Sequence, residues 1–178
     1  MSDLKIFESI IPRKACEQII REGVLRPQIN AGIGKDNTKS EGRSTKVTFI
    51  NNAFTKSYIY ELVTHNYKNY IIEEGEDLQF ATYEEGDFYG YHKDADENNN
   101  RVLSVSVQLS NPTDYEGGNL IFYNLDHGKE GLRDFSPLRH QGSVIVFPSN
   151  TYHQVTPVTK GTRYSLVQWF KGYESRNK

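Results

Sequence analysis

GSVIVFPSNTYHQVTPVTKGTRYSLVQWF, residues 142–170, contains three short runs of β-branched and aromatic residues. The runs are SVIVFP, HQVTPV and RYSLVQWF, and turn-forming residues such as Ser-Asn and Lys-Gly separate them. Short apolar runs bounded by Gly, Pro and Asn are typical of β-strands joined by tight turns. The segment therefore predicts three consecutive strands, and the rest of the chain decides what they pair with.

Runs of the same kind lie upstream. DLQFATY (77–83), RVLSVSVQLS (101–110) and NLIFY (119–123) each predict a strand. In RVLSVSVQLS, leucine and valine alternate with Ser104, Ser106 and Gln108, so the strand has one apolar face and one polar face. The polar face either lines a wet cavity or lies on the solvent side of an outer sheet, and this strand alone does not distinguish the two.

Two helical patterns precede most of these strands. PRKACEQIIREG (12–23) predicts a helix that opens at Pro12 and stops at Gly23. FTKSYIYELVTHNYKNYII (54–72) places apolar residues on one helical face, and LKIFESIIP (4–12) alternates as a strand does. Helices followed by many short strands indicate an α+β fold, mainly β, with helices packed outside a sandwich or barrel.

The chain has 178 residues, 12 tyrosines, one cysteine and a formal net charge of −2. Its length fits a single domain over residues 1–178. A single cysteine cannot form an internal disulfide, which favours a reducing, cytoplasmic setting. No basic tract supports a nucleic-acid partner, and no apolar run is long enough to cross a membrane.

One histidine and one aspartate stand two residues apart in YGYHKDAD (89–96), where a strand runs into a loop. On a strand, side chains at i and i+2 share a face, so His92 and Asp94 would project side by side. His153, which follows the SVIVFP run, supplies a second imidazole. Two histidines and one carboxylate form the facial triad of non-haem Fe(II) oxygenases, which leaves metal positions open for a 2-oxoacid and O₂.

Arg163 follows His153 by ten residues and stands near the start of a predicted strand. A planar guanidinium binds a carboxylate through two parallel hydrogen bonds, so Arg163 suits the far end of an acidic cosubstrate. Ser165 and Trp169 follow Arg163 by two and six residues, so on a strand they lie on the same face as Arg163. Ser165 could add a hydrogen bond to the cosubstrate, and Trp169 could form part of the cavity wall. Taken alone, the His-x-Asp pair could be a chance pattern and Arg163 a surface ion pair. The joint order of all these features favours a site.

The chain resembles the prolyl 4-hydroxylase-like branch of the 2-oxoglutarate/Fe(II)-dependent dioxygenases. TYEEGDFYGYHKD, DYEGGNLIF and the 142–170 segment carry the resemblance, in that order, over about residues 78–170. The resemblance implies a double-stranded β-helix, or jelly roll, with a catalytic core at about 78–172 and N-terminal helices packed on the major sheet. Residues 26–46 and 125–140 are then candidates for loops that close over the site.

Individual roles follow from the resemblance by position. His92, Asp94 and His153 match the iron ligands, and Arg163 matches the residue that binds the distal carboxylate of 2-oxoglutarate. Tyr83 matches a tyrosine that hydrogen-bonds the cosubstrate, and Tyr89 an aromatic on the substrate side. Gln108 is a departure, because animal relatives often have a tyrosine there. The neighbouring positions that match the family are Gly117 and Gly118 at a turn, and Leu120 and Phe122 as wall residues.

The implied activity is hydroxylation of an unactivated C–H bond, with Fe(II), 2-oxoglutarate and O₂ as cofactor and cosubstrates and ascorbate as a candidate addition. The leading substrate is a prolyl residue in a peptide or protein. A dioxygenase acting on nucleic acid or a small molecule, and a jelly roll that binds metal without catalysis, are the alternatives. No nucleic-acid or membrane partner is expected, and the oligomeric state is left open.

Overall fold

The computed structural model describes residues 3–31, 42–123 and 136–175. In chain order its elements are β1 (Lys5–Phe7), α1 (Arg13–Val24), β2 (Ile29–Asn30), β3 (Arg43–Ser44), β4 (Lys46–Ile50), α2 (Ala53–Asn66), β5 (Tyr70–Gly75), β6 (Leu78–Tyr83), β7 (Phe88–His92), β8 (Arg101–Gln108), β9 (Tyr115–Gly117), β10 (Leu120–Phe122), α3 (Ser136–Arg139), β11 (Val144–Pro148), β12 (His153–Val155), β13 (Val158–Gly161) and β14 (Arg163–Glu174).

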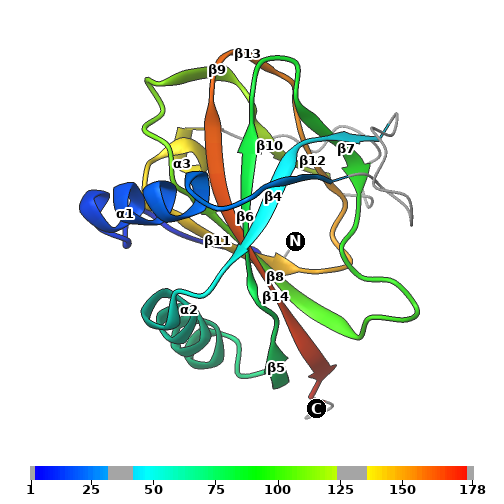
Figure 1. Ribbon diagram of the computed structural model, residues 1–178. Coiled ribbons are helices and arrows are strands. Elements are labelled where there is room, and N and C mark those ends of the chain that lie inside the picture. The colour runs from blue at the N-terminus through cyan, green and yellow to red at the C-terminus, as the bar shows by residue number, and fades with distance from the viewer. Residues whose placement is uncertain (1–2, 32–41, 124–135, 176–178) are drawn as a thin grey trace.

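The described strands form a major sheet, a minor sheet and a short ribbon. The major sheet has the order β1-β11-β8-β14-β6-β4-β2, with β5 also paired to β14, and the minor sheet has the order β10-β12-β7-β3. Strands β9 and β13 pair with each other. Helices α1 and α2 lie on one side of the major sheet, and β7, β10 and β12 lie on the other (Figure 1). The predicted jelly roll with helices on its major sheet is confirmed.

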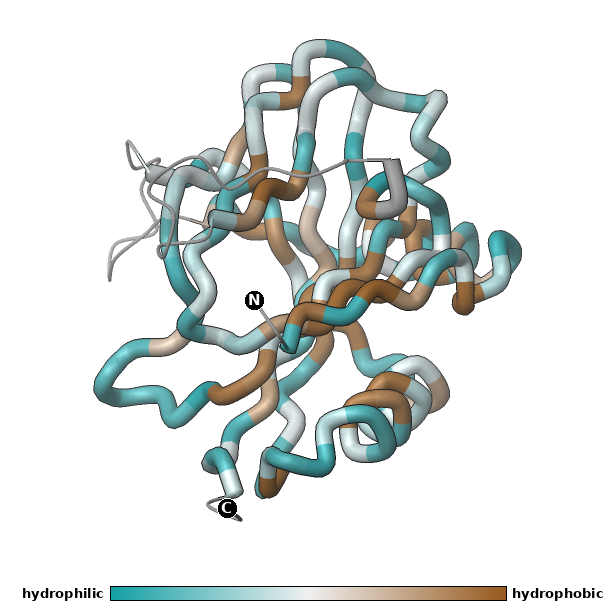
Figure 2. The backbone as a smooth tube through the Cα atoms, turned by 180° about the vertical axis from the view of Figure 1, so that it is seen from behind, coloured by the Kyte–Doolittle hydropathy of each residue, from teal (hydrophilic) through white to brown (hydrophobic). Residues whose placement is uncertain are grey.

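The major sheet has a separate apolar core on each face. One core joins α1 and α2 to side chains such as Phe80, Val107 and Leu166, all of which are fully buried. The other lies between the two sheets and includes Phe122, Ile145 and Phe147. Hydrophobic residues gather in the central strands and in the helices beside them, while many residues of the outer loops are hydrophilic (Figure 2). Both faces of the central strands β8 and β14 are therefore covered, and most of their polar side chains are enclosed.

This arrangement decides between the two interpretations of RVLSVSVQLS. Val105 and Val107 of β8 belong to the core beneath the helices. Ser104, Ser106 and Gln108 point the other way and are also buried, at 0%, 7% and 2% exposure. The polar face of this strand thus lines the space between the sheets and not the solvent.

Three sequence predictions need correction. The helix predicted over 54–72 ends at Asn66, and Tyr70 and Ile71 belong instead to β5, because their pairing with β14 outweighs the helical pattern. Helix α1 continues through Gly23 to Val24. The segment 26–46, predicted as a continuous loop, contains β2 and β3, which pair with β4 and β7. Residues 32–41, and 124–135 of the other predicted lid, lie outside the described part.

No helix in the described ranges is both long and apolar enough to span a membrane.

Gly142 joins three segments just before β11. Its carbonyl accepts from Ile11 N–H at 3.0 Å and its N–H donates to Gln108 O at 2.7 Å. Its φ is +81°, and a Cβ at this position would collide with the carbonyl oxygen of Ile11. Only glycine allows the chain before α1 to approach the end of β8 this closely.

We expect Gly142→Ala to destabilise the protein more than Gly86→Ala. Gly86 has a similar φ of +86°, but a Cβ there would meet nothing within 4 Å. Left-handed strain alone should lower the free energy of unfolding by about 1–2 kcal/mol in Gly86→Ala. Overpacking against the Ile11 backbone should add about 1–3 kcal/mol in Gly142→Ala. Urea unfolding of both variants checks this, and equal losses would contradict the packing role of Gly142.

Candidate active site

The two candidate histidines are brought together by strand pairing in the minor sheet. His92 is the last residue of β7, His153 is the first residue of β12, and the two lie opposite each other in the register of these antiparallel strands. Their ring centroids are 4.2 Å apart. Strand pairing therefore places two imidazoles on one side of the sheet although 60 positions of sequence separate them.

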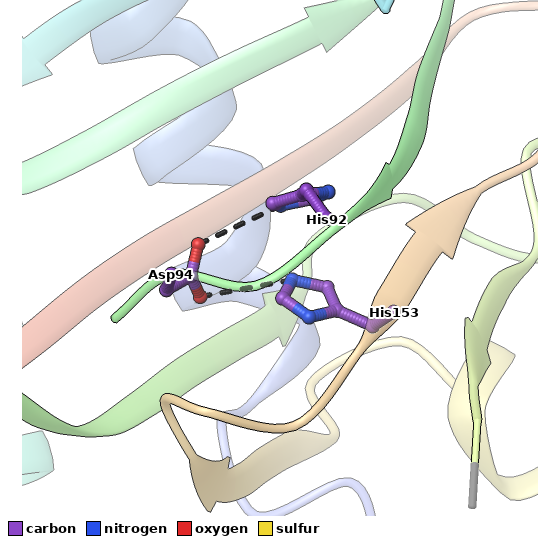
Figure 3. A group of neighbouring side chains, drawn as sticks. All are labelled: His92, Asp94 and His153. Atoms are coloured by element: carbon purple, nitrogen blue, oxygen red, sulfur yellow. Dashed lines mark ion pairs between the residues drawn. The ribbon is translucent and has the colours of Figure 1, made fainter. Parts of the chain in front are cut away.

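Asp94 reaches the same point by a different route from the one predicted. It lies two residues beyond the end of β7, so strand alternation does not orient it. Instead the backbone N–H groups of Asp94 and Ala95 both donate to the carbonyl of Ser149, each at 2.9 Å. This link to the segment between β11 and β12 turns the carboxylate back toward the two imidazoles (Figure 3).

The three side chains form a compact cluster. The Nε2 atom of His92 is 3.6 Å from Oδ1 of Asp94, and Nε2 of His153 is 3.6 Å from Oδ2. One nitrogen or oxygen atom from each residue lies within 4.8 Å of the others, which is close enough to share one metal ion. The two dashed contacts in Figure 3 converge on the carboxylate from separate strands.

The hydrogen bonds of the rings fit a metal. His92 Nδ1 donates to the carbonyl of Gly90 at 2.7 Å, and His153 Nδ1 donates to that of Thr151 at 2.9 Å. Because a carbonyl only accepts, the proton lies on Nδ1 and the Nε2 lone pair points toward Asp94. The buried Nε2 of His92 has no hydrogen-bond partner among the described residues. A metal ion between the three side chains would bind this nitrogen.

The protonation states also suit metal ligands. Burial by itself would raise the pKa of the Asp94 carboxyl, but the attraction of His92 and His153 in their protonated forms outweighs burial and holds that pKa below its ordinary range. Burial lowers the pKa of the His153 imidazole, so the ring is neutral at neutral pH. A carboxylate with neutral imidazole is the form that binds a divalent cation without first losing protons.

Arg163 supplies a buried positive charge in the same cavity. It is 1% exposed, its guanidinium donates to Oε1 of Gln108 at 2.8 Å and to Oγ of Ser165 at 3.3 Å, and it lies 5.0 Å from the ring centre of Tyr83. It pairs with no carboxylate among the described residues, and its Nε has no partner there. A buried cation held by neutral groups is prepared to receive an anion.

Close packing against a turn limits where Arg163 can lie. A Cβ on Gly118, which has a φ of +57°, would come within 3.0 Å of Arg163 Cδ. The predicted Gly-Gly turn before β10 therefore leaves room for the stem of the arginine. Leu120 of β10 lines the cavity, whereas Phe122 packs against Phe147 and His153.

The other predicted residues also line this cavity, which opens between the sheets. Tyr89 stacks on the His92 ring with centroids 3.5 Å apart, and burial raises the pKa of its hydroxyl to about 12. Trp169 is 8% exposed and follows Arg163, Ser165 and Val167 on the inward face of β14. The lining includes Arg43, Gln79, Tyr83, Tyr89, His92, Asp94, Ser106, Leu120, His153, Arg163, Ser165 and Trp169.

Sequence reasoning missed three residues of this cavity. Gln108 was left without a role, yet its side chain accepts from Arg163 and donates to Ser106. Arg43 and Gln79 line the cavity and are hydrogen-bonded to each other. The polar face of the predicted strand 101–110 was the sequence signal that could have assigned Gln108 to the cavity. Arg43 gave little local signal because its segment has the composition of a loop.

Comparison with known proteins matches this site to a family. The model of the 2OG-Fe(II) oxygenase superfamily matches residues 78–171, more than half of the chain. A PKHD-type hydroxylase of Prochlorococcus marinus is 30% identical over 175 residues, which cover 92% of this chain and 75% of that protein. A PKHD-type hydroxylase of Gloeothece citriformis is 40% identical over 96 residues, but the match covers 52% of this chain and 41% of that protein's length.

The fold has solved counterparts. A prolyl hydroxylase from Trichoplax adhaerens, in complex with a peptide fragment of the hypoxia inducible factor oxygen degradation domain, superposes with a TM-score of 0.79 at 18% identity. The superposition covers 95% of this chain and 83% of the other. The fold is therefore that of the prolyl hydroxylases, and with the family match over residues 78–171 the chain belongs to the 2OG-Fe(II) oxygenase superfamily of oxidoreductases, as its sequence resemblance predicted.

Proposed function

We propose that the protein hydroxylates an unactivated C–H bond of a prolyl residue in a peptide or protein, using Fe(II), 2-oxoglutarate and O₂. The observation that carries the proposal is that one cavity contains two different polar sites. A cluster of two imidazoles and one carboxylate lies at the edge of the minor sheet, and a buried arginine that has no acidic partner among the described residues lies on the major sheet facing it. A metal and a dicarboxylate would satisfy both.

Each residue has a definite task in this proposal. His92, Asp94 and His153 would hold Fe(II), which together with 2-oxoglutarate supplies the oxidising chemistry when bound. Arg163 would bind the distal carboxylate of 2-oxoglutarate, with Ser165 as a hydrogen-bond donor and the ring of Tyr83 beside it. Gln108 would act indirectly, because its carbonyl oxygen orients the guanidinium.

The substrate side is the part of the cavity walled by Tyr89 and Trp169. Aromatic walls suit a small saturated ring such as pyrrolidine, which excludes water. Such a ring would meet the edge of Tyr89, because His92 and Arg43 cover the two faces of that ring. Support for a prolyl substrate also comes from the Trichoplax prolyl hydroxylase, whose structure is a complex with a peptide fragment. The formal charge of −2 disfavours nucleic acid as the substrate. A module that binds metal without catalysis would have no use for the buried charge of Arg163.

Three further expectations belong to the same proposal. They are a cytoplasmic location, ascorbate as an added reductant, and one domain over residues 1–178 with its catalytic core at about 78–172.

The first test is the reaction itself. We expect succinate to form from 2-oxoglutarate only when Fe(II) and O₂ are both present, and we expect prolyl peptides to gain one oxygen atom by mass spectrometry. A chelator should abolish both signals. Succinate formation with no gain of oxygen on any prolyl peptide would support a dioxygenase but contradict the prolyl substrate. If no succinate forms at all, the protein is not a 2-oxoglutarate-dependent dioxygenase.

Loss of one ligand should weaken metal binding. His153→Ala should reduce Fe(II) affinity by more than about 100-fold, because even partners outside the ligand set cost about 10–100-fold. His65→Ala is the matched control, since His65 is an exposed histidine of α2. Equilibrium dialysis under nitrogen measures both variants. Unchanged affinity in His153→Ala would exclude this residue as a ligand.

Removal of the buried cation should act on 2-oxoglutarate and not on iron. Arg163→Ala should weaken 2-oxoglutarate binding by about 2–5 kcal/mol, the cost of truncating one partner of a buried charge pair. Arg163→Lys should lose less 2-oxoglutarate affinity, because lysine keeps the positive charge although it lacks the planar guanidinium that forms two parallel hydrogen bonds. Titration of 2-oxoglutarate into the Fe(II)-loaded variants checks the order. If Arg163→Ala bound 2-oxoglutarate as tightly as the unmodified protein does, Arg163 would not be part of the cosubstrate site.

A further inference from the structure

A second buried arginine lies in the cavity, away from Arg163. Arg43 is 9% exposed and stands opposite Tyr89 in the pairing of β3 with β7. It donates to Gln79, and Gln79 lies opposite Val167 in β14, four residues from Arg163. At about 3.3 Å per residue, this is about 13 Å along the strand. The cavity therefore has one cation toward each end.

Neutral groups alone hold Arg43 in the described structure. Its Nε donates to Oγ1 of Thr45 at 2.8 Å and its Nη2 to Oε1 of Gln79 at 3.2 Å. Its guanidinium lies over the Tyr89 ring, 4.2 Å from the centroid. No carboxylate of the described residues forms an ion pair with it, whereas Arg101, another partly buried arginine, is paired with Glu76. Buried charges are normally paired, so Arg43 is an exception that needs a reason.

The cofactors of the proposed function would not supply the missing charge. The two positive charges of Fe(II) and the one of Arg163 balance the single negative charge of Asp94 and the two of 2-oxoglutarate. Arg43 then carries an unbalanced positive charge in the cavity. A third anion would neutralise it, and the remaining component of the reaction is the substrate.

A second donor at the same end also lacks a partner. Trp169 lies two residues beyond Val167 on the inward face of β14 and lines the cavity. Its indole Nε1 is buried and has no hydrogen-bond partner among the described residues. The indole N–H lacks an acceptor and the Arg43 guanidinium lacks an anion among the described residues, and a carboxylate can serve as either.

We propose that the substrate presents a carboxylate to Arg43, beside the proposed iron site. The inference rests on the proposed function and narrows its substrate class to prolyl compounds with an anionic group close to the reacting ring. The carboxylate could be the free C-terminus of a proline or the side chain of an acidic residue next to it. Both offer the planar pair of oxygens that a guanidinium binds through two hydrogen bonds.

The single tryptophan of the chain gives a direct binding signal. Trp169 lines the cavity, so its fluorescence should change when a ligand enters. We would titrate the Fe(II)- and 2-oxoglutarate-loaded protein under nitrogen with three probes. N-acetyl-L-proline carries a terminal carboxylate, N-acetyl-L-prolinamide carries none, and N-acetyl-L-aspartyl-L-prolinamide carries a side-chain carboxylate. The two acidic probes distinguish the two sources of the anion.

We expect at least one acidic probe to bind more than about 30-fold more tightly than the neutral amide. Arg43→Gln should remove this preference, and Arg43→Lys should restore part of it. Lys46→Gln is the matched control for loss of one positive charge, because Lys46 is exposed and paired with Glu84 at 2.7 Å. It should keep the full preference. Thermal unfolding of each variant shows whether it has folded.

Two results would overturn the inference. One is the same affinity for acid and amide in the unmodified protein, including no response to any probe. The other is an undiminished preference for acid in folded Arg43→Gln, which would leave Arg43 as a support for the Tyr89 and His92 rings alone. Succinate formation together with a gain of oxygen by any prolyl peptide, measured with the unmodified protein, tests the proposed function separately. Turnover without acid preference would contradict only the present inference.

Discussion

The alternation of side chains along β8 and β14 is the constraint on which the rest of this structure depends. These strands are neighbours at the centre of the major sheet, so both of their faces are covered. Leu166 and Phe170 of β14 face the helices, and Arg163 and Ser165 face the minor sheet. A shift of one residue in this pairing would place the arginine among the apolar side chains under the helices. The register therefore fixes the fold and the polarity of the cavity together.

A polar cavity between two sheets is costly to maintain, and the structure shows how the cost is offset. Arg163, Gln108, Ser165 and Ser106 form a continuous set of hydrogen bonds. Asp94 is held in place because its own backbone N–H and that of Ala95 donate to the carbonyl of Ser149, and its carboxylate lies 3.6 Å from each of the two imidazoles. Six buried side-chain atoms have no hydrogen-bond partner among the described residues, and three of them belong to residues that line this cavity, namely Nε2 of His92, Nε of Arg163 and Nε1 of Trp169. The other three, in Gln28, Thr82 and Gln168, lie outside it. The three unpaired atoms of the cavity lie where ligands are expected.

The strands and the candidate ligands could be predicted because each depends on local properties of the chain. Strands β6, β8, β11 and β14 follow runs of alternating or β-branched residues. The predictions that were wrong concern segments whose structure depends on distant partners. Tyr70 and Ile71 fit a helical face but join β14 as a strand. Arg43 stands in a segment with the composition of a loop, and pairing with β7 makes it a strand. Asp94 approaches the histidines because Ser149, far away in sequence, accepts its N–H.

By itself the sequence determined the mainly β class, the helices that precede the strands, the candidate ligands His92, Asp94 and His153, and the family. These are properties of residue type, spacing and order, which hold before the chain folds. The tertiary structure alone decided that His92 and His153 face each other across two strands and that Gln108 orients Arg163. It also decided that Arg43 enters the cavity without a described acidic partner. The physical reason is that strand pairing and burial are long-range. Strand pairing and burial determine which side chains are removed from water at the same place. The free energy of a buried charge depends on the groups that share its cavity.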